Sequence, residues 1–142
     1  MRILGLDPGE KRIGVAVSDP LGITAQGIDV INYTSPGEAI DKIEAICLNY
    51  GVGKIVVGKP LRMSGEKGTA AVKAEEFAEA LREKLVIPVA MVDERLTSSR
   101  AEKTLLESGM RRKKRREVKD KLAAVLILEQ YLAMQENDSL NK

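Results

Sequence analysis

The fold is decided by the stretch Ile3-Leu4-Gly5-Leu6-Asp7-Pro8-Gly9-Glu10-Lys11-Arg12-Ile13-Gly14-Val15-Ala16-Val17. Two apolar runs, 3–6 and 13–17, flank a polar turn containing Pro8 and Gly9, residue types that favour tight turns. The pattern predicts a β-hairpin whose first strand ends at Asp7. A carboxylate there is costly unless it is paired or metal-bound. The alternative interpretation is an Asx turn that Asp7 opens with the two residues after it.

Downstream of the hairpin, strand and helix patterns alternate. The residues predict a third antiparallel strand over 23–31, a helix from Ser35-Pro36 to Gly51, a strand over 54–58 buried on both faces, a helix carrying 71–81, a strand over 87–92, and helices over 99–109 and 117–136. Right-handed crossovers make the later strands parallel. This order predicts the α/β class, as one RNase H-like domain over 1–136, with three antiparallel strands followed by two parallel ones. Residues 137–142 are expected to be a frayed tail.

The composition excludes several chemistries. The 142 residues include no histidine, no tryptophan and one cysteine. Without histidine there is no Ser/His/Asp triad, no imidazole base and no His-ligated zinc. The lone Cys47 excludes an internal disulfide and fits a reducing compartment. No apolar run approaches the roughly 18 residues of a spanning helix, so we expect a cytoplasmic protein that does not contact a membrane.

Positive charge is concentrated in one block, Arg111 to Arg116, which holds six consecutive basic residues. The rest of the chain has 17 basic against 21 acidic residues. Such a block suits a phosphate backbone, although runs of like charge are also typical of a solvated loop between helices. A second basic segment, Gly58 to Gly68, contains three glycines and is interpreted as a substrate-binding loop, with a plain surface loop as the alternative.

Acidic residues occur where the predicted sheet and last helix meet. Asp93 and Glu94 follow a strand, and Asp120 lies in the first turn predicted for the last helix, on the apolar stripe of Ala123, Ala124 and Ile127. Each has a simpler explanation, because negative charge is favourable near a helix N-terminus. Together with Asp7 they make an oxygen-only donor set that suits Mg²⁺, with Mn²⁺ as a substitute. The chemistry expected of such a site is phosphodiester hydrolysis.

Four motifs in sequence order resemble one family. They are Gly5 to Asp19, Val57-Gly58-Lys59-Pro60-Leu61 through Gly65, Asp93-Glu94-Arg95-Leu96-Thr97-Ser98, and Asp120 to Leu128. This set is similar to that of the YqgF (RuvX) proteins, RNase H-like proteins described as pre-16S rRNA nucleases and earlier as Holliday junction resolvases. The resemblance implies metal-dependent nuclease activity in the cytoplasm and puts the family's acidic positions on Asp7, Glu94 and Asp120. Lys59 departs from the hydrophobic residue usual between Gly58 and Pro60.

The sequence and the resemblance together predict an endonuclease that matures the 5′ end of pre-16S rRNA, acting as a monomer or weak homodimer. Mg²⁺ is expected on Asp7, Glu94 and Asp120. Backbone contacts are expected from basic side chains, namely Lys11, Arg12, Lys59, Arg62, Lys67, Arg95, Arg111, Arg112, Lys113, Lys114, Arg115 and Arg116. The alternatives are a resolvase acting on branched DNA as a dimer, an RNA-binding ribosome assembly factor without catalysis, and phosphotransfer. Phosphotransfer is disfavoured because actin-like folds normally need two such domains.

Overall fold

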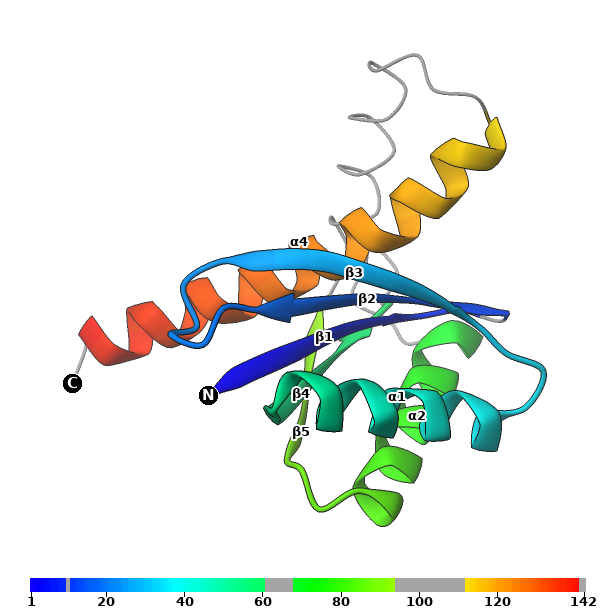
Figure 1. Ribbon diagram of the computed structural model, residues 1–142, viewed down its shortest axis with the longest axis horizontal. Helices are drawn as coiled ribbons and strands as arrows, with labels where there is room; N and C mark the ends of the chain where they lie inside the picture. The colour runs from blue at the N-terminus through cyan, green and yellow to red at the C-terminus, as the bar shows by residue number, and fades with distance from the viewer. Residues whose placement is uncertain (10, 61–67, 94–111, 141–142) are drawn as a thin grey trace.

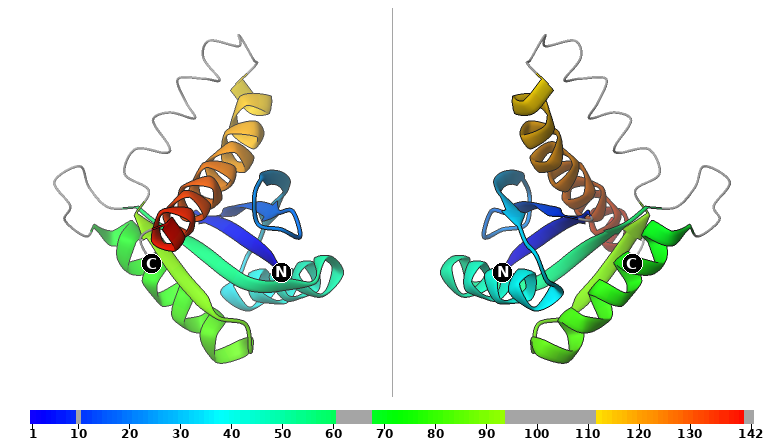
Figure 2. Two further views of the ribbon diagram at one scale, coloured as in Figure 1. Left: turned by 90° about the vertical axis from the view of Figure 1, so that its left-hand side faces the viewer. Right: turned by 90° about the vertical axis from the view of Figure 1, so that its right-hand side faces the viewer.

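The computed structural model describes residues 1–9, 11–60, 68–93 and 112–140, with side chains of the last helix described over 118–135. One five-stranded sheet has the order β3-β2-β1-β4-β5. Helices α1 and α2 cover one face and α4 covers the other (Figures 1 and 2). The elements are β1 (Arg2–Pro8), β2 (Arg12–Ser18), β3 (Ala25–Asn32), α1 (Pro36–Tyr50), β4 (Val52–Lys59), α2 (Thr69–Lys84), β5 (Val89–Asp93) and α4 (Arg112–Leu140).

The predicted hairpin is confirmed. Strands β1 and β2 pair antiparallel, from Leu4 opposite Val17 to Pro8 opposite Ile13. The turn closes where the Gly9 amide donates to the Arg12 carbonyl at 2.9 Å. Strand β3 joins β2 antiparallel, whereas β4 pairs parallel to both β1 and β5. The carboxyl ends of β1, β4 and β5 therefore share one edge of the sheet.

The two faces of the sheet have separate cores. Leu4, Leu6 and Ile13 pack among the residues of α1 and α2, whereas Ile3 and Ala16 pack with α4. Strand β4 contributes to both cores, as its continuous apolar run predicted. Because side chains alternate along a strand, these assignments fix which face each neighbouring strand residue occupies.

Helix α1 begins and ends at the predicted residues. The Ser35 hydroxyl accepts a hydrogen bond from the Glu38 amide at 3.3 Å, and Pro36 occupies the first turn. Gly51 ends the helix with a φ of 66°, a left-handed conformation that glycine adopts without strain.

The last helix begins earlier than predicted. Helix α4 starts at Arg112 instead of near residue 117, so residues 112–116 of the basic block are helical and not part of a loop between helices. Lysine and arginine are good helix formers, which explains why the helix includes them. Asp120 follows Arg112 by eight residues, so the expectation that it stabilises a helix N-terminus is wrong. The helix continues to Leu140, and fraying of the tail stays a prediction. The predicted helix over 99–109 lies outside the described residues.

Among the described segments, no helix combines the length and the apolar character needed to cross a membrane.

We expect Cys47 to resist alkylation in the folded protein. Burial, followed by the negative charge of Glu44, raises the pKa of its thiol from 9.0 to about 11. Two pKa units reduce the thiolate fraction at pH 8 about 100-fold. Iodoacetamide should therefore modify the native protein at least about 100-fold more slowly than the urea-unfolded chain, as followed by mass spectrometry. Equal rates in the two states would contradict a buried, protonated Cys47.

Candidate active site

Helix α4 approaches the sheet over positions that have no side chain. A Cβ atom on Gly14 would lie 1.9 Å from the backbone oxygen of Asp120, and one on Gly5 would lie 3.1 Å from that of Ala124. On the helix side, Ala123, Ala124 and Ile127 are buried, which confirms the predicted packing stripe. The glycines and alanines together bring the helix backbone against the sheet at Asp120.

Asp7 and Asp120 flank the same point of the sheet. Asp7 is paired with Gly14 in the β1–β2 ladder, and antiparallel partners are about 4.5–5.5 Å apart between Cα atoms. Asp7 shares its face with Ile3 and Gly5, both of which contact the α4 side. Two of the three predicted metal-binding carboxylates are thus brought together on one face, at the carboxyl end of β1.

Arg12 forms an ion pair with one of these two carboxylates. Its Nε lies 2.9 Å from Oδ2 of Asp120. That oxygen is buried and accepts no hydrogen bond, so the contact is an ion pair in which the guanidinium N–H does not point at the oxygen. Asp120 therefore keeps acceptor capacity inside the site. Sequence reasoning had assigned Arg12 to the phosphate backbone and not to a carboxylate.

The third predicted metal-binding carboxylate, Glu94, is not among the described residues, and its neighbour Asp93 is the last residue of β5. Asp93 is in register with Lys59 of β4 and alternates with Val89 and Met91, which pack against the α1 and α2 core. Asp93 therefore belongs to the face opposite α4, away from Asp7. Within the described part of the chain, no three acidic, cysteine or histidine side chains form a metal-binding group.

The predicted phosphate-binding residues are distributed over both faces. Lys59 pairs with Glu75 of α2 at 3.5 Å, on the face opposite α4, and Lys11 is exposed beside the hairpin turn. Arg62, Lys67, Arg95 and Arg111 lie outside the described residues. Residues 112–116 are helical, and their side chains are outside the described set.

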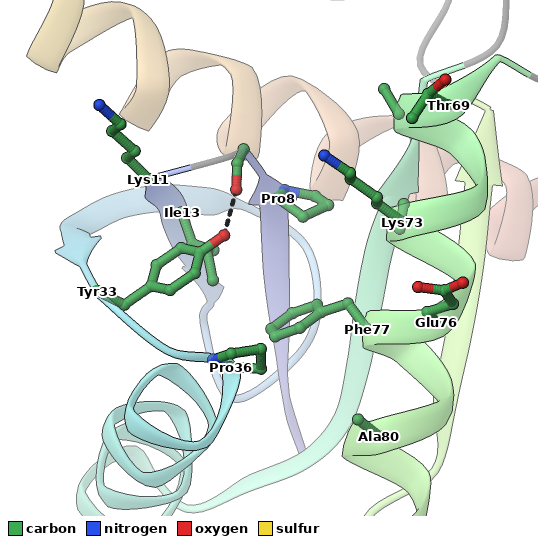
Figure 3. Close-up of a pocket in the computed structure, with 13 residues that line it drawn as sticks. Pro8, Lys11, Ile13, Tyr33, Pro36, Thr69, Lys73, Glu76, Phe77 and Ala80 are labelled. Atoms are coloured by element: carbon green, nitrogen blue, oxygen red, sulfur yellow. Dashed lines mark hydrogen bonds between the residues drawn. The ribbon is translucent and has the colours of Figure 1, made fainter.

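Sequence reasoning missed a cavity on the face opposite α4. It has a volume of about 920 Å³ and lies between the hairpin turn, the start of α1 and helix α2 (Figure 3). Tyr33, Lys73 and Phe77 line it. Their spacing gives no signal in the sequence, because Tyr33 is 40 residues from Lys73 and the crossover through β4 brings them together.

Comparison with known proteins gives the family. The family model described as "RuvX: Holliday junction resolvase" matches residues 1–134. The chain belongs to the RuvX family. A relative from Pelotomaculum thermopropionicum, named "Putative pre-16S rRNA nuclease", is 52% identical over 136 residues, covering 95% of this chain and 88% of that protein. One with the same name from Listeria innocua is 48% identical over 134 residues, covering 93% and 97%.

Solved structures of similar fold confirm the predicted RNase H-like architecture. Thermus thermophilus RuvC, in complex with a Holliday junction substrate, has a TM-score of 0.61 at 15% identity and covers 96% of each chain. The fowlpox virus resolvase, in complex with Holliday junction DNA, has a TM-score of 0.56 at 12% identity, covering 95% of this chain and 99% of that one. At these identities the likeness establishes the fold alone.

Proposed function

We propose that this protein is a divalent-metal-dependent endonuclease that cleaves phosphodiesters in structured RNA and matures the 5′ end of pre-16S rRNA. The observation that carries the proposal is the convergence of Asp7 and Asp120 across Gly14, at the carboxyl end of the central strand. Membership of a nuclease family and the names of relatives about 50% identical support it. A cytoplasmic location, where precursor rRNA is found, is part of the same proposal.

The side chains present fit a hard divalent cation. The donors are carboxylate oxygens, and one of them, Oδ2 of Asp120, is buried without accepting a hydrogen bond. Oxygen donors of this kind suit Mg²⁺, with Mn²⁺ as a substitute. Asp7, Asp120 and, from the motif, Glu94 would hold the ion. When bound, it supplies activation of water and stabilisation of the charge that develops on phosphate oxygens.

Charged side chains of the protein determine the electrostatic potential at the site where the ion and the substrate would bind. Asp7 and Asp120 concentrate negative charge on the α4 face, and Arg12 offsets part of it at 2.9 Å. A guanidinium beside the carboxylates also offers a donor to a phosphate oxygen. Lys11 and the basic residues 111–116 add positive charge for the backbone, so binding should be strongly salt-dependent.

The second candidate function is resolution of branched DNA, which the family description names. It requires two sites that act on opposite strands and therefore predicts a dimer on gel filtration. A third candidate, a ribosome assembly factor without catalysis, predicts salt-dependent RNA affinity with no cleavage at any enzyme concentration.

One assay distinguishes these candidates. The purified full chain is incubated with precursor 16S rRNA and with a synthetic four-way DNA junction, each with Mg²⁺ or with EDTA and at two salt concentrations. We expect Mg²⁺-dependent cleavage near the 5′ end of the rRNA, with the junction left largely intact. Symmetric cuts in the junction alone would favour the resolvase, and RNA binding without any Mg²⁺-dependent product would overturn the nuclease proposal.

We expect Arg12→Gln to separate metal binding from substrate binding. Removing the guanidinium takes away a positive charge that competes with a cation for Asp120, so less Mg²⁺ should be needed for half-maximal cleavage, by about 3- to 10-fold. The same change removes a phosphate donor, so KM for RNA should rise. Titrations of Mg²⁺ and of RNA on one preparation measure both. A higher Mg²⁺ requirement would show that Arg12 supports the cation instead of competing with it.

A further inference from the structure

The cavity on the face opposite α4 has one wall that is held in place by hydrogen bonds. Its volume of about 920 Å³ lies within the roughly 300–1,000 Å³ of small-molecule sites. The Tyr33 hydroxyl donates a hydrogen bond to the Gly9 carbonyl, and the Tyr33 amide donates to the Lys11 carbonyl at 3.2 Å. The segment that follows β3 is thereby tied to the hairpin turn, and the Tyr33 ring is held as one wall.

The opposite wall is the face of α2 that carries Phe77. Figure 3 shows Tyr33 extending from the segment after β3 and Phe77 extending from α2, with Pro36 below the two rings. Both rings are half-buried and pack against the core, so their positions are fixed by the fold. The chain has three tyrosines, one phenylalanine and no tryptophan, and two of these four aromatic residues line this one cavity.

Positive charge lies at one end of the cavity. Lys73, one helical turn before Phe77, extends toward Pro8 at this end (Figure 3), and Lys11, from the hairpin, also lines the cavity, with its ammonium group directed away from Lys73. Glu76 also lines the cavity, but in Figure 3 its carboxylate is directed away from the two lysines. The cavity thus combines a cationic end with an apolar interior between two aromatic rings.

We propose that this cavity binds one unpaired nucleotide of the RNA substrate, with its base between Tyr33 and Phe77 and its phosphate at Lys73. Bases stack on aromatic side chains, and lysines neutralise the adjoining phosphate. Pro8 and Gly9, which line the cationic end, follow Asp7 directly in the chain. An RNA strand bound at the sheet edge beside Asp7 would therefore also pass the cavity, because the residues that line the cavity begin immediately after Asp7 in the chain. This inference rests on the proposed function and adds an anchoring site to it.

The first test is an NMR titration of the ¹⁵N-labelled full chain with AMP, adenosine, ribose 5-phosphate and a single-stranded RNA oligonucleotide. We expect AMP to shift amide signals of residues 9, 11, 33 and 69–77, with adenosine and ribose 5-phosphate each binding at least about 10-fold more weakly. The oligonucleotide should bind at least about 10-fold more tightly than AMP and displace it. No shift at these residues, or AMP binding that the oligonucleotide does not displace, would overturn the proposal.

Matched variants test the contacts. Phe77→Leu keeps an apolar side chain but removes the stacking surface, and Lys73→Gln removes the cation. Each should weaken AMP and RNA binding by about 10-fold or more. Lys84→Gln makes the same charge change in the same helix, outside the cavity and beside Asp41, and should bind within about twofold of the wild type. Binding by both cavity variants at the wild-type level would overturn the proposal.

Failure of the cavity and failure of the nuclease proposal give different results. Nucleotide binding is measured without Mg²⁺ and should persist in Asp7→Asn, which acts on the other face. Cleavage by a protein that binds no nucleotide in the cavity would overturn the inference but leave the nuclease intact. Binding in the cavity without cleavage would overturn the nuclease proposal but leave the inference about the cavity intact.

Discussion

Asp7→Asn is expected to reduce Mg²⁺-dependent cleavage by at least about 100-fold while the protein stays folded. The change keeps the size of the side chain and removes a negative charge from the residue that pairs with Gly14, against which the backbone of Asp120 packs. Mutation of a residue that only hydrogen-bonds to a metal ligand already reduces metal affinity or activity by about 10- to 100-fold. Loss of a direct ligand should reduce them at least as much. RNA affinity should change little, because the basic residues supply most of it.

The thermal midpoint gives a readout of Asp7→Asn that does not depend on cleavage. A cation that binds only the folded state raises Tm, so Mg²⁺ should stabilise the wild type and have much less effect on the variant. Asp41→Asn, an identical change on the exposed surface of α1, serves as the control and should cleave and respond to Mg²⁺ like the wild type. Wild-type cleavage by Asp7→Asn would contradict the metal site.

Local patterns in the sequence predicted the parts of the fold that local physics determines. The hairpin at residues 3–17 follows from two apolar runs around a Pro-Gly turn, and α1 follows from Ser35 and Gly51 as its caps. The stripe of Ala123 and Ala124 beside Asp120 was predicted from helical periodicity, and both alanines are buried. These features need only neighbours within a few residues.

Features that depend on distant contacts were not predicted. The basic residues 112–116 are compatible with both a loop and a helix, because the charge run has no apolar face to set a period, and the structure continues α4 through them. The face that each strand-end residue occupies also depends on tertiary packing, which turns Lys59 toward Glu75 of α2. The spacing of Lys73 and Phe77 places them on one face of a helix but does not show what lies against that face. That they border a cavity is therefore known only from the fold.

Gly14→Ala is expected to be the most damaging single-methyl change in the described part of the chain. The added Cβ would lie 1.9 Å from the backbone oxygen of Asp120 and 2.7 Å from its carbonyl carbon. Because these are helix backbone atoms, no side-chain rotation relieves the clash, and α4 must move away from β2. Overpacking typically costs about 1–3 kcal/mol, and a backbone clash belongs at or above the upper end of that range. At about 2–4 °C per kcal/mol for a chain of this size, Tm should fall by roughly 6–12 °C.

A methyl group added at Gly37 is expected to increase the stability of the protein instead of decreasing it. Gly37 is in the first turn of α1, does not have a positive φ, and a Cβ added to it would meet no atom within 4 Å. Gly37→Ala should therefore raise the free energy of unfolding by about 0.4–1 kcal/mol, through the lower entropy of the unfolded chain. Urea unfolding of both variants measures the difference, and cleavage should fall only in Gly14→Ala, because moving α4 moves Asp120 relative to Asp7. Equal stability of the two variants would show that α4 does not approach β2 as closely as Gly14 permits. It would also contradict the inference that Asp7 and Asp120 lie close together.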